Sequence, residues 1–104
     1  MKQEQFDVIL SDRLNRIKTV LGNKAKEYAV GGDRLHNFKV AARINNCTPA
    51  EALWGMAMKH LVCIEDLIQD RVKATDGLID EKIGDMINYL ILLEALLQET
   101  IDRR

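Results

Sequence analysis

Residues 48–72 read TPAEALWGMAMKHLVCIEDLIQDRV, and this stretch carries a strong signal for a helix at the centre of the fold. Thr48 suits the N-cap position, Pro49 suits the first turn, and Glu51 can reach back to complete a capping box. The apolar residues that follow lie on more than one side of the helix. Because such a helix must contact neighbours all round, the stretch predicts a central helix that runs to about Val72.

Two further helices are predicted on the N-terminal side of this stretch. Residues 5–21 repeat apolar side chains at spacings of three and four, which indicates an amphipathic helix that stops or bends at Gly22. The clearest loop is residues 30–33, which contain two adjacent glycines. Asp33 can then cap a short helix that extends to about Ile44.

The last predicted helix covers residues 78–102 and is apolar on most sides between Ile83 and Leu97. Together with the other segments it predicts an all-α bundle of about four helices, with residues 1–104 in one domain. The surplus apolar surface on this helix indicates a homo-oligomer, most simply a dimer.

Composition limits the classes of partner that the chain can have. The 15 basic and 16 acidic residues give a net charge of -1, which argues against capture of duplex nucleic acid by a dense basic face. The longest strongly apolar run is shorter than the ~20 residues that span a bilayer. The first residues do not resemble a signal peptide. We therefore expect a soluble, cytoplasmic protein without a membrane partner.

Oxygen-bearing side chains lie along one face of the last predicted helix. Glu81 and Asp85 are four residues apart, and Asn88 follows three residues later. A row of oxygen ligands that leads into a bundle is how helical proteins build sites for hard cations such as Mg²⁺. The alternative is that Glu81 and Asp85 are solvated acids, favoured near a helix start by the helix dipole.

The central helix adds Lys59 and Asp66, which are seven residues apart and therefore share a face. Lys59 can hold a phosphate, and Asp66 can be a further metal ligand or orient a water. The alternative is a solvated stripe with no specific partner. His60, one step round the helix, is expected to be a core or boundary residue rather than a ligand.

A third cluster surrounds the predicted glycine loop, and loops held by helices often carry binding residues. Tyr28 or Phe38 can stack on a base, although both can equally be core anchors that flank a turn. The cations that can meet a phosphate here are Lys24, Lys26, Arg34 and His36. The glycine pair is no phosphate-binding loop, because the lysine and hydroxyl ending is missing and no strand precedes it.

Several segments between residues 14 and 97 together resemble a family of small phage and bacterial proteins described as nucleotide-modification-associated. The segments that carry the resemblance include Asn37-Phe38, Leu53-Trp54-Gly55-Met56, Lys59-His60-Leu61 and Asn88-Tyr89-Leu90. Residues 81–85 are also similar to the second acidic motif of the MazG-like all-α nucleoside triphosphate pyrophosphohydrolases. This resemblance implies a helical, oligomeric protein that cleaves (d)NTPs to monophosphate and pyrophosphate with Mg²⁺.

The chain departs from the MazG-like pattern at both acidic motifs. Where that superfamily has a glutamate three residues before the aspartate, this chain has Lys82, and Glu81 lies four residues before Asp85. The superfamily's first motif, three glutamates on an earlier helix, is missing, and only Lys59, Glu65 and Asp66 lie where it would be. A site with fewer carboxylates can bind a nucleotide without cleaving it.

The leading hypothesis is therefore a nucleotide-binding phage-type protein that uses Mg²⁺ and is a candidate (d)NTP pyrophosphohydrolase. The predicted metal ligands are Asp66, Glu81 and Asp85. Asn88 would orient a ligand or water beside them. The predicted phosphate contacts are Lys24, His36 and Lys59, and the predicted base or sugar contacts are Tyr28 and Asn37. If catalysis occurs, it would be metal-assisted attack by water.

A second hypothesis belongs to another class: a non-catalytic helical interaction module, such as a phage accessory protein that binds a protein partner. The two hypotheses differ in geometry. A nucleotide site predicts that Lys59, Asp66, Glu81, Asp85 and Asn88 converge in one pocket. An interaction module predicts that they point to solvent, and that the apolar surplus forms an exposed patch.

Overall fold

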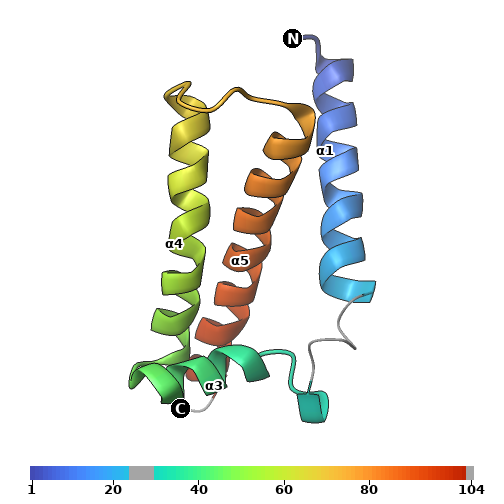
Figure 1. Cartoon of the computed structure of the whole chain (residues 1–104). Helices are drawn as coiled ribbons and strands as arrows, with labels where there is room; N and C mark the ends of the chain where they lie inside the picture. The colour runs from blue at the N-terminus through green and yellow to red at the C-terminus, as the bar shows by residue number, and fades with distance from the viewer. Residues whose placement is uncertain (24–29, 103–104) are drawn as a thin grey trace.

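The computed structural model describes residues 1–23 and 30–102, and within these residues all regular structure is helical. The main helices are α1 (Gln3–Ile17), α3 (His36–Asn45), α4 (Pro49–Ile68) and α5 (Asp76–Asp102). Two short helical segments, the π-helical η1 (Lys18–Asn23) and the 3-10 turn η2 (Val30–Gly32), lie between α1 and α3. Figure 1 shows α1, α4 and α5 running lengthwise, with α3 across the lower ends of α4 and α5. The all-α prediction is confirmed.

The start of α4 forms as its sequence predicts. The Thr48 side chain accepts a hydrogen bond from the Glu51 backbone N–H at 3.2 Å, and the Glu51 carboxylate accepts one from the Thr48 N–H at 3.0 Å. These bonds satisfy two helix-end amides that would otherwise lack partners. The hydrogen bond from the Thr48 backbone N–H, with a further contribution from the Thr48 side chain, holds the pKa of the Glu51 carboxyl below its usual value.

The predicted end of α4 at Val72 is wrong, because the helix stops at Ile68. Asp70 adopts a left-handed conformation with φ of 59° and ends the helical path. The Arg71 N–H then donates to the Asp66 carbonyl at 2.9 Å, which closes the last turn as a Schellman motif. Aspartate tolerates this conformation better than most residues do, but it gives a weaker sequence signal than glycine.

Two other helix starts differ from the prediction by a few residues. α5 begins at Asp76 rather than Leu78, because the Thr75 hydroxyl caps it by accepting from the Leu78 N–H at 3.1 Å. α3 begins at His36, three residues after Asp33. The Asp33 carboxylate still accepts an amide hydrogen bond, from the Leu35 N–H at 3.0 Å, but in a turn that precedes the helix.

The core lies where α3 packs across the lower ends of α4 and α5. Leu53 of α4 is fully buried at its centre. The other buried members of this cluster are Leu35, Phe38 and Leu96, and the partly buried side chains that pack on it are Met56, Tyr89, Leu92 and Leu93. This packing confirms that the stretch after Thr48 is central.

A polar clasp also holds α3 against α5. The Lys39 ammonium donates to the Asp33 carboxylate at 2.7 Å and to the Glu99 carboxylate at 2.8 Å. These bonds raise the pKa of Lys39 and lower that of Asp33. The clasp joins residues that are sixty positions apart in sequence and fixes α3 on the end of α5.

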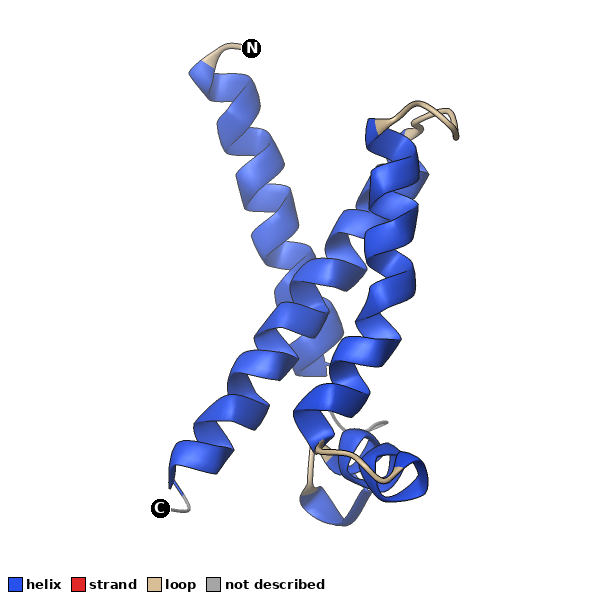
Figure 2. Cartoon of the chain, turned by 90° about the vertical axis from the view of Figure 1, so that its left-hand side faces the viewer, coloured by secondary structure: helices blue, strands red, loops and turns tan. Residues whose placement is uncertain are grey.

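α1 is attached far less extensively than the other helices, and none of its residues is buried. Arg13 and Arg16 both form ion pairs with the Asp80 carboxylate of α5, at 3.0 and 2.8 Å. Above this contact the N-terminal end of α1 diverges from α4 and α5 (Figure 2). None of the helices in the described ranges is long and apolar enough to cross a membrane.

Candidate functional site

A pocket of about 430 Å³ lies where α3, α4, α5 and η1 meet, and we call it the α5 pocket. Its lining residues are Val20, Leu21, Arg34, Asn37, Phe38, Met56, His60, Asp85, Asn88, Tyr89 and Leu92. Among the described residues, about half of this lining is apolar, and the rest consists of one cation, one carboxylate, two amides, an imidazole and a phenol. Apolar walls with a few convergent polar groups are the usual composition of a small-molecule site.

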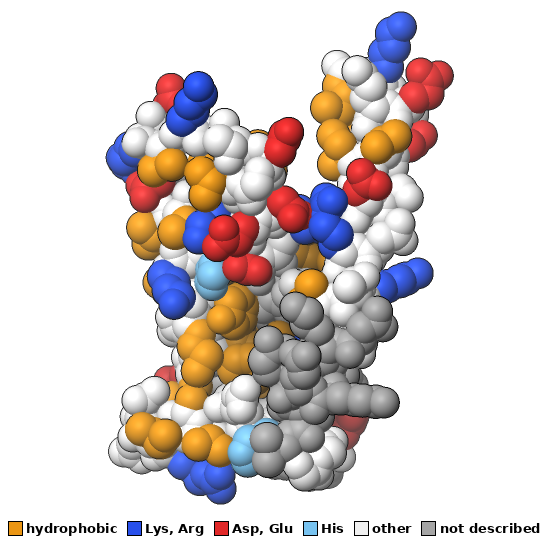
Figure 3. Space-filling model, turned by 45° about the vertical axis from the view of Figure 1, so that its right-hand side comes forward, with side chains coloured by type: hydrophobic (Ala, Val, Ile, Leu, Met, Phe, Trp, Pro, Cys, Tyr) orange, Lys and Arg blue, Asp and Glu red, His pale blue; other side chains and the backbone are white. Residues whose placement is uncertain are grey.

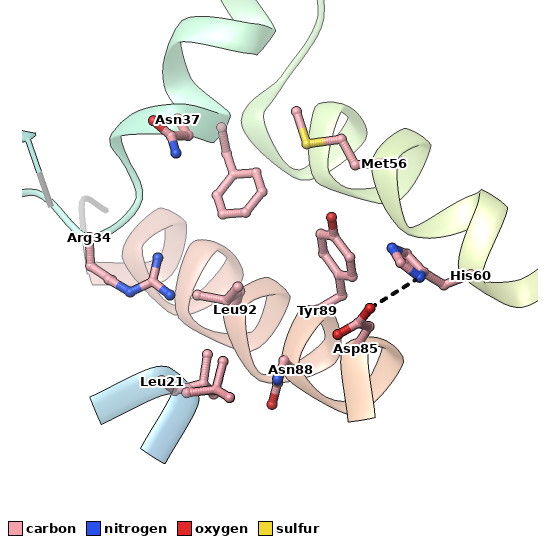
Figure 4. A pocket seen from close by; sticks show the side chains of 11 residues that line it. Leu21, Arg34, Asn37, Met56, His60, Asp85, Asn88, Tyr89 and Leu92 are labelled. Carbon is pink, nitrogen blue, oxygen red and sulfur yellow. Dashed lines mark ion pairs between the residues drawn. The ribbon is translucent and has the colours of Figure 1, made fainter. Parts of the chain in front are cut away.

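His60 and Asp85 face each other across the α4–α5 junction, as Figure 4 shows. The His60 Nδ1 atom lies 3.7 Å from the nearer Asp85 oxygen, which is close enough for charge attraction but too long for a hydrogen bond. The imidazole is largely buried, with 13% of the side chain exposed, whereas Asp85 is 43% exposed. Asp85 can therefore receive a ligand from solvent while it remains beside the imidazole.

Two buried polar atoms in this pocket have no hydrogen-bond partner among the described residues: His60 Nδ1 and Asn88 Oδ1. Buried polar side-chain atoms in folded proteins nearly always have a partner, because an unmet one costs about 1–3 kcal/mol. Asn88 lies three residues after Asp85 and thus on the same face of α5. Two residues of the pocket lining, one on α4 and one on α5, therefore have unmet hydrogen-bonding capacity within the described part of the chain.

Tyr89 forms the aromatic part of the pocket wall. Its ring lies 5.2 Å from the His60 ring, centre to centre, at an interplanar angle of 40°. Burial raises the pKa of the Tyr89 phenol, and the nearby Asp85 carboxylate adds to the effect. The phenol therefore stays neutral near pH 7 and can donate a hydrogen bond.

Arg34 and Asn37 come from the opposite side of the pocket, from the start of α3 and the turn before it. Figure 4 shows both side chains across from Asp85, Asn88 and Tyr89 of α5. Arg34 was among the cations expected near a phosphate, and Asn37 was expected at a base or sugar. The structure brings these two residues to the same cavity as Asp85 and Asn88.

The three predicted metal ligands are not brought together. Within residues 1–23 and 30–102, no group of three or more His, Cys, Asp or Glu side chains lies close enough to hold a metal ion. Asp66 forms an ion pair with Arg71 at 3.2 Å, at the far end of α4. Glu81 pairs with the adjacent Lys82 at 3.1 Å and is 58% exposed. Of the three, only Asp85 lines the α5 pocket.

The reason lies in where each acid falls along its helix. Asp66 lies six residues beyond His60, so it is more than one and a half turns away from the Asp85 level. It also neighbours the Schellman turn that carries Arg71, which supplies a local cation. The spacing of residues along one helix shows which of them share a face. It does not show how far one helix is shifted along its axis relative to the next helix.

The residues that were predicted to contact the phosphate and the base also lie in different parts of the molecule. Lys59 lines a second hollow, of about 550 Å³, together with Glu51 and Cys47. This hollow shares Met56 and Tyr89 with the α5 pocket. His36 is the first residue of α3 and is not part of the α5 pocket lining, whereas its neighbour Asn37 is. Lys24 and Tyr28 lie outside the described residues, and so their predicted roles stay predictions.

His60 is the pocket residue that sequence reasoning valued too little. It was expected to be a satisfied core or boundary residue, but its Nδ1 atom has no hydrogen-bond partner in the described part of the chain. A signal was present, since His60 lies three and seven residues after Ala57 and Leu53, which are both buried. That spacing places His60 on the inward face of α4.

The chain was also compared with protein-family models, with curated proteins and with solved structures. It matches no family model, no curated protein and no solved structure.

Proposed function

We propose that the protein is a MazG-like, phage-type protein of nucleotide metabolism that binds a nucleotide in the α5 pocket. The observation that carries the proposal is that His60 and Asn88, which each keep a buried polar atom without a partner among the described residues, line one cavity together with a cation and an aromatic ring. A nucleotide offers the complementary groups. Its base donates and accepts hydrogen bonds and stacks on aromatic rings, and its phosphates pair with arginine.

Each pocket residue has a role in this proposal. Arg34 contacts the phosphates, because it is the cation among the described lining residues. Asn88 and Asn37 hydrogen-bond to the base or sugar, since an amide can donate and accept at once. The His60 and Tyr89 rings form the wall against which the base lies.

Asp85 is the carboxylate that the described residues contribute to the pocket. Mg²⁺ commonly binds through one or two carboxylates together with substrate phosphates and water. We propose that the ion enters with the nucleotide phosphates and that Asp85 is its protein ligand. The pyrophosphohydrolase activity implied by the resemblance needs a larger carboxylate set, so the present proposal is for binding.

A thermal-shift screen of (d)NTPs and (d)NMPs, with and without Mg²⁺, tests this proposal. A ligand at a hundred times its Kd stabilises the native state by about 2.7 kcal/mol. For a chain of this size the expected rise in Tm is on the order of 10 °C. We expect at least one nucleotide to produce such a rise, and Asp85→Ala to reduce the Mg²⁺-dependent part of it.

The matched control is Glu81→Ala, which removes a carboxylate from the same helix one turn away. Glu81 is exposed and pairs with Lys82, so its loss should leave the nucleotide-induced shift unchanged. If no nucleotide raises the Tm of the wild-type protein, the proposal is wrong. Equal loss of the shift in both variants would also contradict the α5 pocket as the site.

The second hypothesis, a non-catalytic interaction module, predicted exposed apolar surface, and some of the described helices have it. Trp54, Met58 and Val62 of α4 are 42, 42 and 56% exposed and lie four residues apart along one face. This row favours a partner protein there. It does not compete with the α5 pocket, because none of the three residues lines that pocket. A nucleotide-induced thermal shift tests the α5 pocket alone, and a protein partner at this row would be tested by its own binding.

A further inference from the structure

A glycine in the interior of α5 makes room for a side chain of α1. Gly84 is buried within α5, where a glycine weakens the helix relative to alanine. A Cβ atom at Gly84 would lie 2.5 Å from the Nη1 atom of Arg13, which is too close for two unbonded atoms. An alanine therefore fits at position 84 only if the Arg13 guanidinium moves away. We call this contact between Arg13 and α5 at Gly84 the Gly84 notch.

The Gly84 notch holds Arg13 where it can anchor α1. The Arg13 Nη2 atom pairs with the Asp80 carboxylate at 3.0 Å and donates to the Asp80 carbonyl at 3.4 Å. The Arg13 side chain is only 16% exposed, so solvent and salt screen these contacts less than they screen a surface pair. Arg16 pairs with the same carboxylate at 2.8 Å, but it is 48% exposed, and such exposed pairs contribute little. Arg13 is therefore the stronger polar anchor of the two.

α1 depends on this anchor because it has little other support. None of its residues is buried. Its projecting end stands apart from the rest of the molecule, at the upper right of Figure 3, and acidic and basic side chains meet where the two parts come together. An isolated helix of this length is marginal in water. Displacement of Arg13 should therefore shift α1 toward an undocked state.

The docking of α1 also shapes the α5 pocket. η1 continues directly from α1, and its residues Val20 and Leu21 form part of the pocket lining. A smaller hollow of about 110 Å³ lies between α1 and α5 and is lined in part by Arg13 and Gly84. The residues that this hollow shares with the α5 pocket are Val20, Asp85 and Asn88. Movement of α1 away from α5 would thus take one wall of the α5 pocket with it.

We propose that the Gly84 notch regulates the α5 pocket. When α1 is docked, Val20 and Leu21 complete the pocket wall, and a ligand bound against that wall holds α1 docked in return. Such coupling is reciprocal by linkage. Arg13 and Gly84 are positioning residues, since they act on the ligand through η1. The inference rests on the proposed nucleotide binding and adds the element that controls it.

Isothermal titration calorimetry of Gly84→Ala tests the coupling. The added methyl group displaces the Arg13 guanidinium, whereas alanine itself favours the helical state of α5. Only docked chains bind with full affinity, so a variant that is docked about a third of the time should show a roughly threefold higher nucleotide Kd. The matched control is Gly77→Ala on the same helix, where a Cβ would meet nothing within 4 Å. Its Kd should equal that of the wild-type protein.

A double variant tests whether Gly84 acts through Arg13. Arg13→Ala removes the same anchor and should raise the nucleotide Kd by about the same factor. In the Arg13→Ala protein, Gly84→Ala should add no further loss, because the guanidinium that it displaces is absent. A second loss of similar size in the double variant would overturn the role of the Gly84 notch.

Hydrogen exchange measures the docking of α1 itself, because it reports the minority of chains in which a segment has opened. None of residues 3–17 lines the α5 pocket, yet nucleotide should slow amide exchange along them in the wild-type protein. In ligand-free Gly84→Ala these amides should exchange faster than in the wild-type protein. If the wild-type protein binds nucleotide but α1 gains no protection, or if Gly84→Ala binds with unchanged Kd, this inference is overturned and the proposed function stands. If the wild-type protein binds no nucleotide, the proposed function fails and its regulation fails with it.

Discussion

Among the polar clusters that join α5 to its neighbours, the clasp to α3 and the α5 pocket differ in how far the described residues satisfy their hydrogen-bonding groups. In the clasp of Asp33, Lys39 and Glu99, the lysine donates hydrogen bonds to both carboxylates at 2.7 and 2.8 Å. In the α5 pocket, His60 and Asn88 each keep a buried polar atom without a partner in the described chain. The clasp is explained by its structural role alone, because its satisfied hydrogen bonds hold two helices together. Buried polar atoms without partners, as in the α5 pocket, lower the stability of the fold. A bound ligand that satisfies them would explain why they are present.

The largest effect is expected at Asn88. Asn88→Leu replaces the amide by an apolar group of similar size and removes the unmet oxygen. We expect the free energy of unfolding of the ligand-free protein to rise by about 1 kcal/mol. Nucleotide affinity should fall by roughly 30- to 100-fold, because the base or sugar loses its hydrogen-bond partner.

Urea unfolding and isothermal titration calorimetry on the same Asn88→Leu preparation measure both effects. A variant that is less stable than the wild-type protein would show that Asn88 serves the fold. Unchanged nucleotide affinity would show that the ligand does not contact it.

Lys39→Met should produce the opposite result. Removal of the ammonium leaves the Asp33 and Glu99 carboxylates close together without a cation, and we expect a loss of about 1–2 kcal/mol in urea unfolding. Nucleotide affinity should remain within roughly threefold, since Lys39 does not line the α5 pocket. A loss of affinity larger than the loss of stability would mean that the two clusters are not independent.

The smallest effect is the pH dependence of the clasp. The Lys39 ammonium and the Leu35 N–H hold the pKa of Asp33 below its usual value of 3.8. A carboxylate whose pKa is lower in the folded state stabilises the fold above its unfolded-state pKa, and that contribution is lost as the pH falls through the folded-state value. The stability difference between wild-type and Asp33→Asn proteins should therefore shrink on acidification from neutral pH to below 4. A difference that grows on acidification would contradict the clasp.

Local signals allowed much of the fold to be predicted. The Thr48 capping box and the apolar pattern after it correctly indicated a central helix, because both depend on residues a few positions apart. The end of α4 was missed, since Asp70 takes a left-handed conformation that sequence associates mainly with glycine. The Thr75 cap was missed because the glycine that follows it suggested a longer turn.

The candidate site was predicted less well, for a different physical reason. Asp85, Asn88 and Asn37 do reach one pocket, and Glu81, Lys59 and Asp66 do not. Which residues of α4 face which residues of α5 depends on the axial offset and rotation of two packed helices. Those quantities are set by side-chain packing around Leu53, and no spacing within a single helix encodes them.

The central claim is most directly tested by nuclear magnetic resonance of the ¹⁵N-labelled protein titrated with the best nucleotide from the thermal-shift screen. We expect the largest amide shift changes to cluster at Arg34–Phe38, at His60 and at Asp85–Leu92, with little change at Asp66 or along α1. Shift changes centred on α1 or on the Asp66 end of α4, or none at saturating nucleotide, would contradict it.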